Sequence, residues 1–244
     1  MYYSNSKIEF EGEYSNGKRW NGHIKEYHDN DVLFFEGEYR NGVKEGNGKE
    51  YYYNGALFFE GEYSNNNKNG KGKEYFEDGQ LKYVGEYSDG KRNGKWIEYY
   101  ENGSLQSELV YKNGLLNGEI KKYFWNGQIE FVGEYLNNQI NGHVIQYYEN
   151  SKLQFEGEYK NGLKHGKGKE YNYIGEVIFD GEYSFGNRWN GIGKEYDQFK
   201  NNKLLFDGEY LNGKRWRGKG KEYDHFNYGK LIFEGEYVDG KLVP

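Results

Sequence analysis

The sequence predicts an all-β protein built of consecutive β-hairpins, and three observations lead to this prediction. A phrase of aromatic residue, any residue, glycine, glutamate and tyrosine returns at a nearly constant interval, which marks a repeat array. Asn-Gly pairs, which tolerate the positive φ of tight turns, separate segments with strand-like alternation. Proline, which would remove a hydrogen bond from a strand ladder, occurs once among the 244 residues, at Pro244.

The repeated phrase accounts for nearly the whole chain. Its final tyrosines lie 24 residues apart, except for one interval of 25 and two of 27, and only the copy at residues 107–111 breaks the pattern. We therefore expect a single array over residues 1–244, with about nine full hairpin units and a terminal half unit, and no separate catalytic domain. The intact copies lie at residues 10–14, 35–39, 59–63, 83–87, 131–135, 155–159, 179–183, 206–210 and 233–237.

One unit, residues 33–55, shows how the phrase forms a hairpin. Because side chains alternate between the two faces of a strand, Phe35, Gly37 and Tyr39 share one face, while Glu36 and Glu38 point to the other. An Asn-Gly turn follows at residues 41–42, residues 46–52 form the return strand, and a second Asn-Gly at residues 54–55 closes the unit. Strands and turns therefore alternate without helices.

The central glycine of the phrase leaves a bare stretch of backbone because it has no Cβ. We expect aromatic rings of neighbouring strands to cover this backbone. The alternative is that the glycine only relieves crowding or permits a strong twist.

Insertions occur at a few defined places. Three units carry one extra residue beside an Arg-Trp pair, at residues 19–20, 188–189 and 215–216. Two further residues are added between Tyr196 and Tyr210, and again between Tyr223 and Tyr237. A slip of one residue within a strand would exchange its two faces, yet the phrase resumes intact each time. The insertions are therefore predicted to lie in loops or bulges.

The unit resembles the MORN repeat. Residues 155–168 read FEGEYKNGLKHGKG, which contains the aromatic phrase, then Asn-Gly, then Gly-x-Gly. The resemblance spans about residues 8–241, and middle units such as residues 95–103 are similar to variant MORN repeats of bacterial proteins, some labelled antitoxins. The departures are Ser107 and Leu109 in the fifth unit, Asn66 in place of a turn glycine in the third, and the longer late loops.

This resemblance implies an elongated, twisted, single-layer antiparallel sheet with a groove along one face. In this family the repeats usually serve as interaction platforms or scaffolds, often at a membrane-linked or cytoskeletal cortex. The resemblance thus implies a cytoplasmic location, cortical or peripheral to a membrane. The departures in the fifth unit imply a groove that is interrupted there.

Composition excludes several classes of function. The net charge is −6, and lysine and glutamate are interleaved, which is typical of a solvated face rather than of a nucleic-acid interface. The chain has no cysteine, which excludes disulfides and thiolate chemistry. Its first residues lack the pattern of a signal peptide, and no apolar run is long enough to span a membrane.

No constellation of residues predicts catalysis. The five histidines, His23 and His28 among them, show no convincing zinc-binding arrangement. The recurring Gly-x-Gly pairs lead into strand-like segments rather than into a helix, so they do not read as phosphate-binding loops. We predict that the protein is not an enzyme and has no catalytic residue, metal site or cofactor.

The glutamate of the phrase recurs in nine units, for example as Glu38 and Glu62. One interpretation is an acidic ladder that attracts a cation or a basic partner. We favour a second interpretation, in which these glutamates face lysines of neighbouring strands. Examples of such lysines are Lys25, Lys49, Lys73 and Lys169.

The sharpest candidate for a binding site is the Arg-Trp cluster late in the chain. Adjacent repeats place Trp189 and Trp216 on one edge, and Trp and Arg are enriched in binding hot spots. The alternative is that each Trp fills the gap created by its inserted residue. The candidate partner-binding residues, including tyrosines of the aromatic face, are Trp189, Trp216, Arg188, Arg215, Arg217, Tyr159, Tyr183 and Tyr210.

These observations favour a non-enzymatic protein–protein interaction scaffold. Strand edges at the ends of the array could also pair with another copy, giving a homodimer or end-to-end association. A module that binds or tethers membrane phospholipids is an alternative, which the acidic charge disfavours. An antitoxin-like inhibitor of a toxic partner is a weaker alternative that rests on the resemblance alone. Nucleic acid is not an expected partner.

Overall fold

The computed structural model describes residues 10–197, 203–223 and 231–243, and all regular structure in these ranges is β-strand. The chain forms two compact units, the first ending at Gln128 and the second beginning at Ile129, and each is described by itself. The predicted all-β fold of consecutive antiparallel hairpins is therefore confirmed. The extent predicted for the array, residues 1–244, includes segments outside the described residues.

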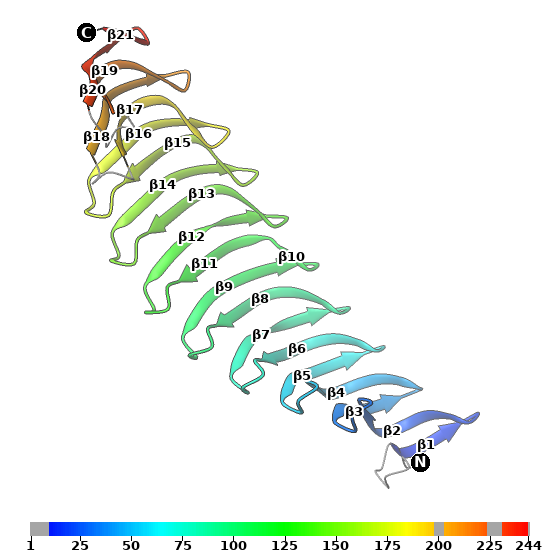
Figure 1. Cartoon of the computed structure of the whole chain (residues 1–244). Coiled ribbons are helices and arrows are strands. Elements are labelled where there is room, and N and C mark those ends of the chain that lie inside the picture. The colour runs from blue at the N-terminus through cyan, green and yellow to red at the C-terminus, as the bar shows by residue number, and fades with distance from the viewer. Residues whose placement is uncertain (1–9, 198–202, 224–230, 244) are drawn as a thin grey trace. The chain divides into compact units, whose positions relative to one another are not determined.

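Strands that follow one another pair antiparallel within each unit, so each unit is an open sheet of hairpins (Figure 1). The strands of unit 1 are β1 (Phe10–Ser15), β2 (Lys18–Tyr27), β3 (Leu33–Arg40), β4 (Val43–Tyr51), β5 (Leu57–Ser64), β6 (Asn67–Tyr75), β7 (Leu81–Ser88), β8 (Lys91–Tyr99), β9 (Leu105–Lys112), β10 (Leu115–Leu116) and β11 (Gly118–Tyr123). Those of unit 2 are β12 (Ile129–Leu136), β13 (Gln139–Tyr147), β14 (Leu153–Lys160), β15 (Leu163–Tyr171), β16 (Val177–Ser184), β17 (Asn187–Asp197), β18 (Lys203–Leu211), β19 (Lys214–Tyr223), β20 (Leu231–Val238) and β21 (Lys241–Val243).

We number the hairpins in chain order. Hairpins 1 to 4 are β1–β2, β3–β4, β5–β6 and β7–β8, and hairpin 5 is β9 with β10 and β11. Hairpins 6 to 10 are β12–β13, β14–β15, β16–β17, β18–β19 and β20–β21. Hairpin turns lie along one edge of each unit, and the connections between hairpins lie along the other (Figure 1).

The tight turns arise from the predicted Asn-Gly pairs. In hairpin 2 both Asn41 (φ 52°) and Gly42 (φ 81°) have positive φ, the type I′ geometry that matches the twist of a hairpin. The turn is also tied to the hairpin before it, because the amide of Gly42 donates to the carbonyl of Trp20 at 2.9 Å. The same bond joins Gly90 to Lys68 and Gly213 to Trp189.

Aromatic rings cover the glycines, as the sequence predicts, with one difference between the two strands. A Cβ on Gly48, in the return strand, would lie 2.9 Å from the rings of both Phe35 and Tyr63, which belong to the two neighbouring strands. A Cβ on Gly37, in the first strand, would instead meet the Phe35 ring of its own strand at 2.7 Å and the backbone of Gly48 at 3.0 Å. The glycines therefore make room both for a ring and for close strand approach.

Some hairpins fill the same space in another way. At the place that Gly48 occupies in hairpin 2, hairpins 1, 4, 5 and 6 carry a fully buried side chain. The Trp96 indole packs edge-on against Tyr87, with ring centroids 4.9 Å apart, and donates from Nε1 to the carbonyl of Glu86 at 3.0 Å. The four substituting residues are Ile24, Trp96, Ile120 and Val144.

The Arg-Trp insertions form β-bulges, as predicted. In hairpin 8, Glu182 lies opposite Asn190 and Tyr183 lies opposite Arg188, so Trp189 is the extra residue. The register shifts in the same way beside Trp20 and Trp216. The two later insertions fall around residues 198–202 and 224–230, which lie outside the described residues.

Candidate functional site

The aromatic face is closed by clusters of a cation, a carboxylate and rings. Lys68 Nζ lies 2.8 Å from Glu50 Oε2 and 3.8 Å from the centroid of the Phe59 ring. Tyr63 donates to the other oxygen of Glu50 at 2.6 Å. The carboxylate belongs to the return strand of one hairpin and the cation to that of the next, so each cluster binds two hairpins together.

Equivalent clusters recur in both units. Unit 1 contains Lys44 with Glu26 at 2.9 Å and Arg92 with Glu74 at 2.9 Å. In unit 2, Arg188 pairs with Glu170, and Arg215 pairs with Glu195. All of these charged side chains are half-buried.

Glu170 differs from the other carboxylates because it serves two cations. Lys164 Nζ lies 2.5 Å from Oε1 and Arg188 Nη2 lies 2.5 Å from Oε2. Gln146, in hairpin 6, stands where most other return strands carry a glutamate, the residue that would pair with Lys164. Burial opposes ionisation of Glu170, but Lys164 and Arg188 outweigh it, so the pKa of this carboxyl lies below its ordinary value.

The structure places five of the predicted binding residues in this packed face. Tyr183 and Tyr210 are buried, and Tyr159 is half-buried beside them. Arg188 and Arg215 are held by their ion pairs, and each guanidinium lies over a phenylalanine ring. These side chains hold the hairpins together, and a role for them in partner binding stays a prediction.

The other three predicted residues lie at the edge formed by the hairpin turns. Trp189 packs on the turn of the next hairpin, where a Cβ on Gly213 would lie 3.3 Å from the indole, yet its side chain remains 38% exposed. Trp216 packs in the same way on Gly240. Arg217 donates to Asp239 at 2.8 Å. The positions of Trp189 and Trp216 are therefore compatible both with a role in partner binding and with filling the gap created by the inserted residue.

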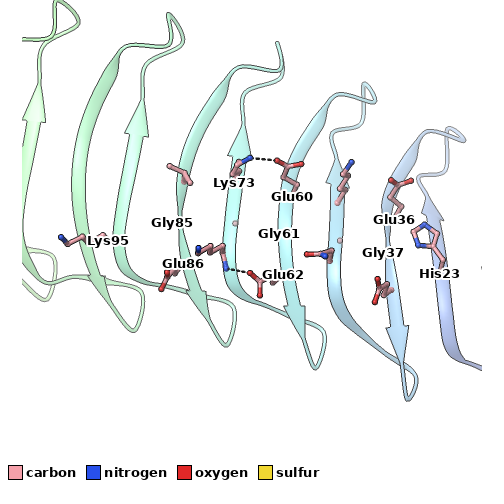
Figure 2. A pocket seen from close by; sticks show the side chains of 17 residues that line it. His23, Glu36, Gly37, Glu60, Gly61, Glu62, Lys73, Gly85, Glu86 and Lys95 are labelled. Atoms are coloured by element: carbon pink, nitrogen blue, oxygen red, sulfur yellow. Dashed lines mark hydrogen bonds and ion pairs between the residues drawn. The ribbon is translucent and has the colours of Figure 1, made fainter.

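The opposite, charged face of unit 1 carries a groove of about 710 Å³. Its floor is the glycine backbone of successive strands, and a row of charged side chains stands on each side (Figure 2). One row is Glu36, Lys49, Glu60 and Lys73, and the other is Glu38, Glu62, Lys71, Glu86 and Lys95.

Ion pairing in the groove differs from the sequence prediction. Lys73 pairs with Glu60 at 3.0 Å and Lys25 with Glu36 at 3.7 Å, so the partner is the acid before the glycine of the phrase. The prediction that the glutamate after the glycine pairs with these lysines is wrong. The reason is the register between strands, which places Lys49 opposite Glu36 on one side and opposite Glu60 on the other, whereas the glutamate after the glycine lies opposite a different residue, as Glu86 lies opposite Lys71.

The two rows of the groove are therefore in different electrostatic states. Glu60 accepts from Tyr75 at 2.7 Å and from Lys73, and these bonds hold the pKa of its carboxyl below the ordinary value. In the second row, Glu62 accepts from the backbone amide of Lys71 at 3.2 Å. Among the described residues Glu38 and Glu86 form no salt bridge, so their carboxylates are available to a ligand.

Unit 2 has a smaller version of this groove, with a volume of about 540 Å³. It is lined by the corresponding side chains, including Glu156, Glu158, Lys167 and Glu182, and by His143 at one end. In each groove the same few residue types repeat from strand to strand.

Two further observations concern other kinds of site. In the part of the chain that the structure describes, no cluster of three or more His, Asp or Glu is arranged to hold a metal ion. Residues 10–197, 203–223 and 231–243 also contain no helix capable of crossing a membrane.

Comparison with protein families agrees with the geometry of the hairpins. The MORN repeat matches residues 10–20, 35–57, 59–81 and 155–177, and the MORN repeat variant matches residues 20–41, 92–113 and 140–161. Together the matches cover more than half of the chain. The chain belongs to the MORN-repeat family. The three variant matches contain Ile24, Trp96 and Val144, so in this protein the variant coincides with hairpins that replace a ring-covered glycine by a buried side chain.

Likeness to individual proteins is slight. No curated protein matches the sequence of this MORN-repeat chain. A solved structure described as "Crystal Structure of TcdB2-TccC3-Cdc42" is similar at 10% identity and a TM-score of 0.20, covering 92% of this chain and 15% of that chain. Another, "Crystal Structure of TcdB2-TccC3", has 11% identity and a TM-score of 0.21, covering 86% and 15%. The chain thus spans about 15% of the length of these structures.

Two features of the site were not found from the sequence. The buried substitutes for glycine have a signal, since an apolar residue stands where most units have the second glycine of Gly-x-Gly. The cation–carboxylate clusters join residues 18 to 20 positions apart, as in Lys68 with Glu50 and Arg215 with Glu195. They could have been found only with the register between hairpins known.

Proposed function

We propose that this MORN-repeat protein is a non-enzymatic scaffold that binds protein partners through the charged groove of unit 1. MORN repeats are in general non-catalytic and are known in protein-binding and membrane-binding roles. The observation that carries the proposal is the contrast between the faces. The aromatic face uses its charges internally, whereas the groove presents Glu38 and Glu86 without a salt bridge beside a floor of strand backbone.

The groove suits an extended polypeptide that runs across the strands. Such a segment would meet charged side chains at each strand, about every 4.8 Å, and it would lie on the strand backbone between the two rows. Each exposed pair contributes only about 0.2–1 kcal/mol, so affinity depends on several contacts made at once. Arrays of this kind favour partners with alternating charge.

Charge reversal in the groove tests the proposal. In affinity capture with the full chain, we expect the triple variant Glu38→Lys/Glu62→Lys/Glu86→Lys to lose a partner that the unchanged protein retains. All three side chains are exposed, so the variant should fold. The control, Glu77→Lys/Glu101→Lys/Glu149→Lys, changes the net charge equally at exposed connections between hairpins and should retain the partner. Equal capture by all three proteins would refute the groove as the binding site.

Phospholipid binding is less well supported than protein binding. The net charge of −6 and the glutamates of the groove oppose attraction to an anionic leaflet. Flotation with vesicles of phosphatidylcholine and phosphatidylserine separates the two functions. Recovery of the protein with the vesicles, unaffected by the charge reversals, would favour lipid over a protein partner.

Three further proposals accompany the scaffold. The protein acts in the cytoplasm, at its cortex or beside a membrane, which fractionation of cells would test. Copies associate through exposed edge strands such as β21, all of whose residues are exposed, and sedimentation at rising concentration would reveal this. The scaffold could also act as an inhibitor of a toxic partner. In that case, expressing this protein together with the toxic partner would restore the growth of cells that the partner alone inhibits.

A further inference from the structure

Phe185 occupies an unusual position at the turn of hairpin 8. Its φ is 48°, a left-handed conformation that is costly for a bulky side chain. The same place in each of the other hairpin turns holds Asn or Asp, as at Asn161 and Asn212. The Phe185 side chain is 78% exposed, so burial within the chain does not offset the strain. An apolar side chain that is both strained and exposed points to a function outside the folded chain.

The neighbouring turns of unit 2 extend this feature into a stripe. We define the turn-edge stripe as Leu163, Phe185, Leu211 and Val238, whose side chains are all exposed. Phe185 lies in the turn of hairpin 8, and the others are the strand residues next to the turns of hairpins 7, 9 and 10. The turn of hairpin 5 in unit 1 also exposes a leucine, Leu115, but the turns of hairpins 3 and 4 expose only polar residues. In unit 2, by contrast, every hairpin has an exposed apolar side chain at or next to its turn, including Leu136 in hairpin 6.

Along this edge an apolar side chain of each hairpin packs on the turn of the next. The Leu163 side chain reaches the turn of hairpin 8, where a Cβ on Gly186 would lie 3.6 Å from it. Trp189 then covers Gly213 in the turn of hairpin 9, and Trp216 covers Gly240 in the turn of hairpin 10. The apolar surface thus passes from turn to turn along the edge.

Lysines flank the stripe at the turns of hairpins 7, 9 and 10. In the strand register, Lys160 lies opposite Leu163 and Lys214 lies opposite Leu211. Lys241 is opposite Val238 in hairpin 10. A ligand that covers the apolar side chains therefore meets a positive charge beside three of the four turns.

We propose that the turn-edge stripe docks an amphipathic helix of a protein partner, with acidic residues beside its apolar face. Successive hairpin turns are about 10 Å apart, since each hairpin adds two strands at about 4.8 Å. A helix rises about 10.5 Å in seven residues, so one apolar side chain per heptad would meet one turn each. The lysines then face acidic side chains on the flanks of the helix.

An anionic membrane fits the same edge less well. Glu158, Glu182, Glu209 and Glu236 stand two or three residues before the turn tips and would face the lipid headgroups. Anionic leaflets attract polybasic segments, and this edge alternates lysines with carboxylates. The arrangement therefore favours the helix.

The test uses the full chain and a display library of four-heptad helical peptides with randomised surface positions. We expect enriched peptides to carry an apolar residue every seventh position with Asp or Glu on both flanks. Phe185→Asn, which installs the residue type of the other turns, should weaken binding of these peptides at least tenfold while the protein stays folded. Leu115→Asn, which removes an exposed turn leucine in unit 1, should leave binding unchanged.

Other outcomes would overturn the proposal. These are the absence of enrichment, a different apolar spacing, or equal binding by the Phe185→Asn variant. Flotation with phosphatidylcholine–phosphatidylserine vesicles that depends on Phe185 would assign the stripe to lipid instead. The groove variant Glu38→Lys/Glu62→Lys/Glu86→Lys should bind the peptides normally, so failure of the stripe and failure of the groove are distinguished.

Discussion

Hairpins 3 and 4 are neighbours in unit 1, yet they fill the same internal volume differently. In hairpin 3, Gly72 leaves room for the rings of Phe59 and Tyr87, which a Cβ there would meet at 2.6 Å and 3.1 Å. In hairpin 4, Trp96 stands at the corresponding place and fills the space with its own indole. In both hairpins a cation of the return strand lies over an aromatic ring. Lys68 lies over Phe59 in hairpin 3, and Arg92 lies over Trp96 in hairpin 4.

The comparison shows what the repeat keeps constant. Residue identity changes from glycine to the largest side chain, while the filled volume and the cation over the ring are retained. Interiors at near-crystalline density tolerate such exchanges only when total volume is conserved. The ring over glycine and the buried substitute are therefore two forms of one packing unit. A hairpin of either form should be destabilised when this one residue is replaced by that of the other form and its neighbours are unchanged.

The largest effect is expected from Trp96→Ala. Removing the buried indole leaves a cavity next to Gly85, Tyr87 and Arg92, and such truncations cost about 3–5 kcal/mol of the free energy of unfolding. Urea denaturation of the full chain measures the loss. Trp125→Ala is the matched control, since Trp125 lies in the same unit but is 64% exposed, and it should change stability by less than about 0.5 kcal/mol. A similar small effect at both positions would contradict the account of hairpin 4.

The reverse exchange, Gly72→Val, should be smaller but clear. The Phe59 ring already occupies the space, so the added side chain must displace it at a cost of about 1–3 kcal/mol. A valine is accommodated at the corresponding place in hairpin 6, where Val144 is fully buried. Adding Phe59→Leu to Gly72→Val should recover part of the loss, which a double-mutant cycle would show as coupling. If the changes in stability caused by Gly72→Val and Phe59→Leu were simply additive, the two residues would not share one packing volume, and the comparison with hairpin 4 would fail.

Hairpins 6 and 7 extend the contrast to charge, because Gln146 in hairpin 6 leaves Lys164 to share Glu170 with Arg188. The folded state holds the pKa of Glu170 below its ordinary value. Its contribution to stability is therefore complete above about pH 5, where the unfolded carboxyl is ionised, and is lost as pH falls through the folded pKa.

Glu170→Gln tests this assignment. Because the substitution leaves two half-buried cations without their carboxylate, it should cost about 1–3 kcal/mol at pH 7. Unfolding measured from pH 7 down to pH 3 should show that the difference between variant and unchanged protein shrinks as the medium becomes acidic. The exposed Glu149→Gln serves as control. A difference that is constant over this range would exclude the proposed ionisation.

The sequence predicts the hairpins well because their signals are local. Asn41-Gly42 specifies its turn by φ alone, and alternation assigns Phe35 and Glu36 to opposite faces. Predictions that depend on register between strands are less secure. The strand register places the partner lysines opposite the acid before the glycine, and no local signal in the sequence reports that register. The clusters around Glu50 and Glu170 require two successive hairpins to be placed correctly, which periodicity alone does not provide.

The smallest expected effect concerns a large side chain that is not packed. Trp96 and Phe185 both stand where most repeats have a smaller residue, but only Trp96 is buried. Phe185→Asn relieves a left-handed conformation that Asn adopts more easily, so we expect a gain of about 0.5–1 kcal/mol in the free energy of unfolding. Thermal denaturation measures it, with Asn161→Phe as the reciprocal variant that should lose a similar amount. If the Phe185→Asn variant becomes more stable and at the same time loses helix binding, the strain at Phe185 is kept for recognition. If the variant becomes less stable, the phenyl ring supports the turn itself.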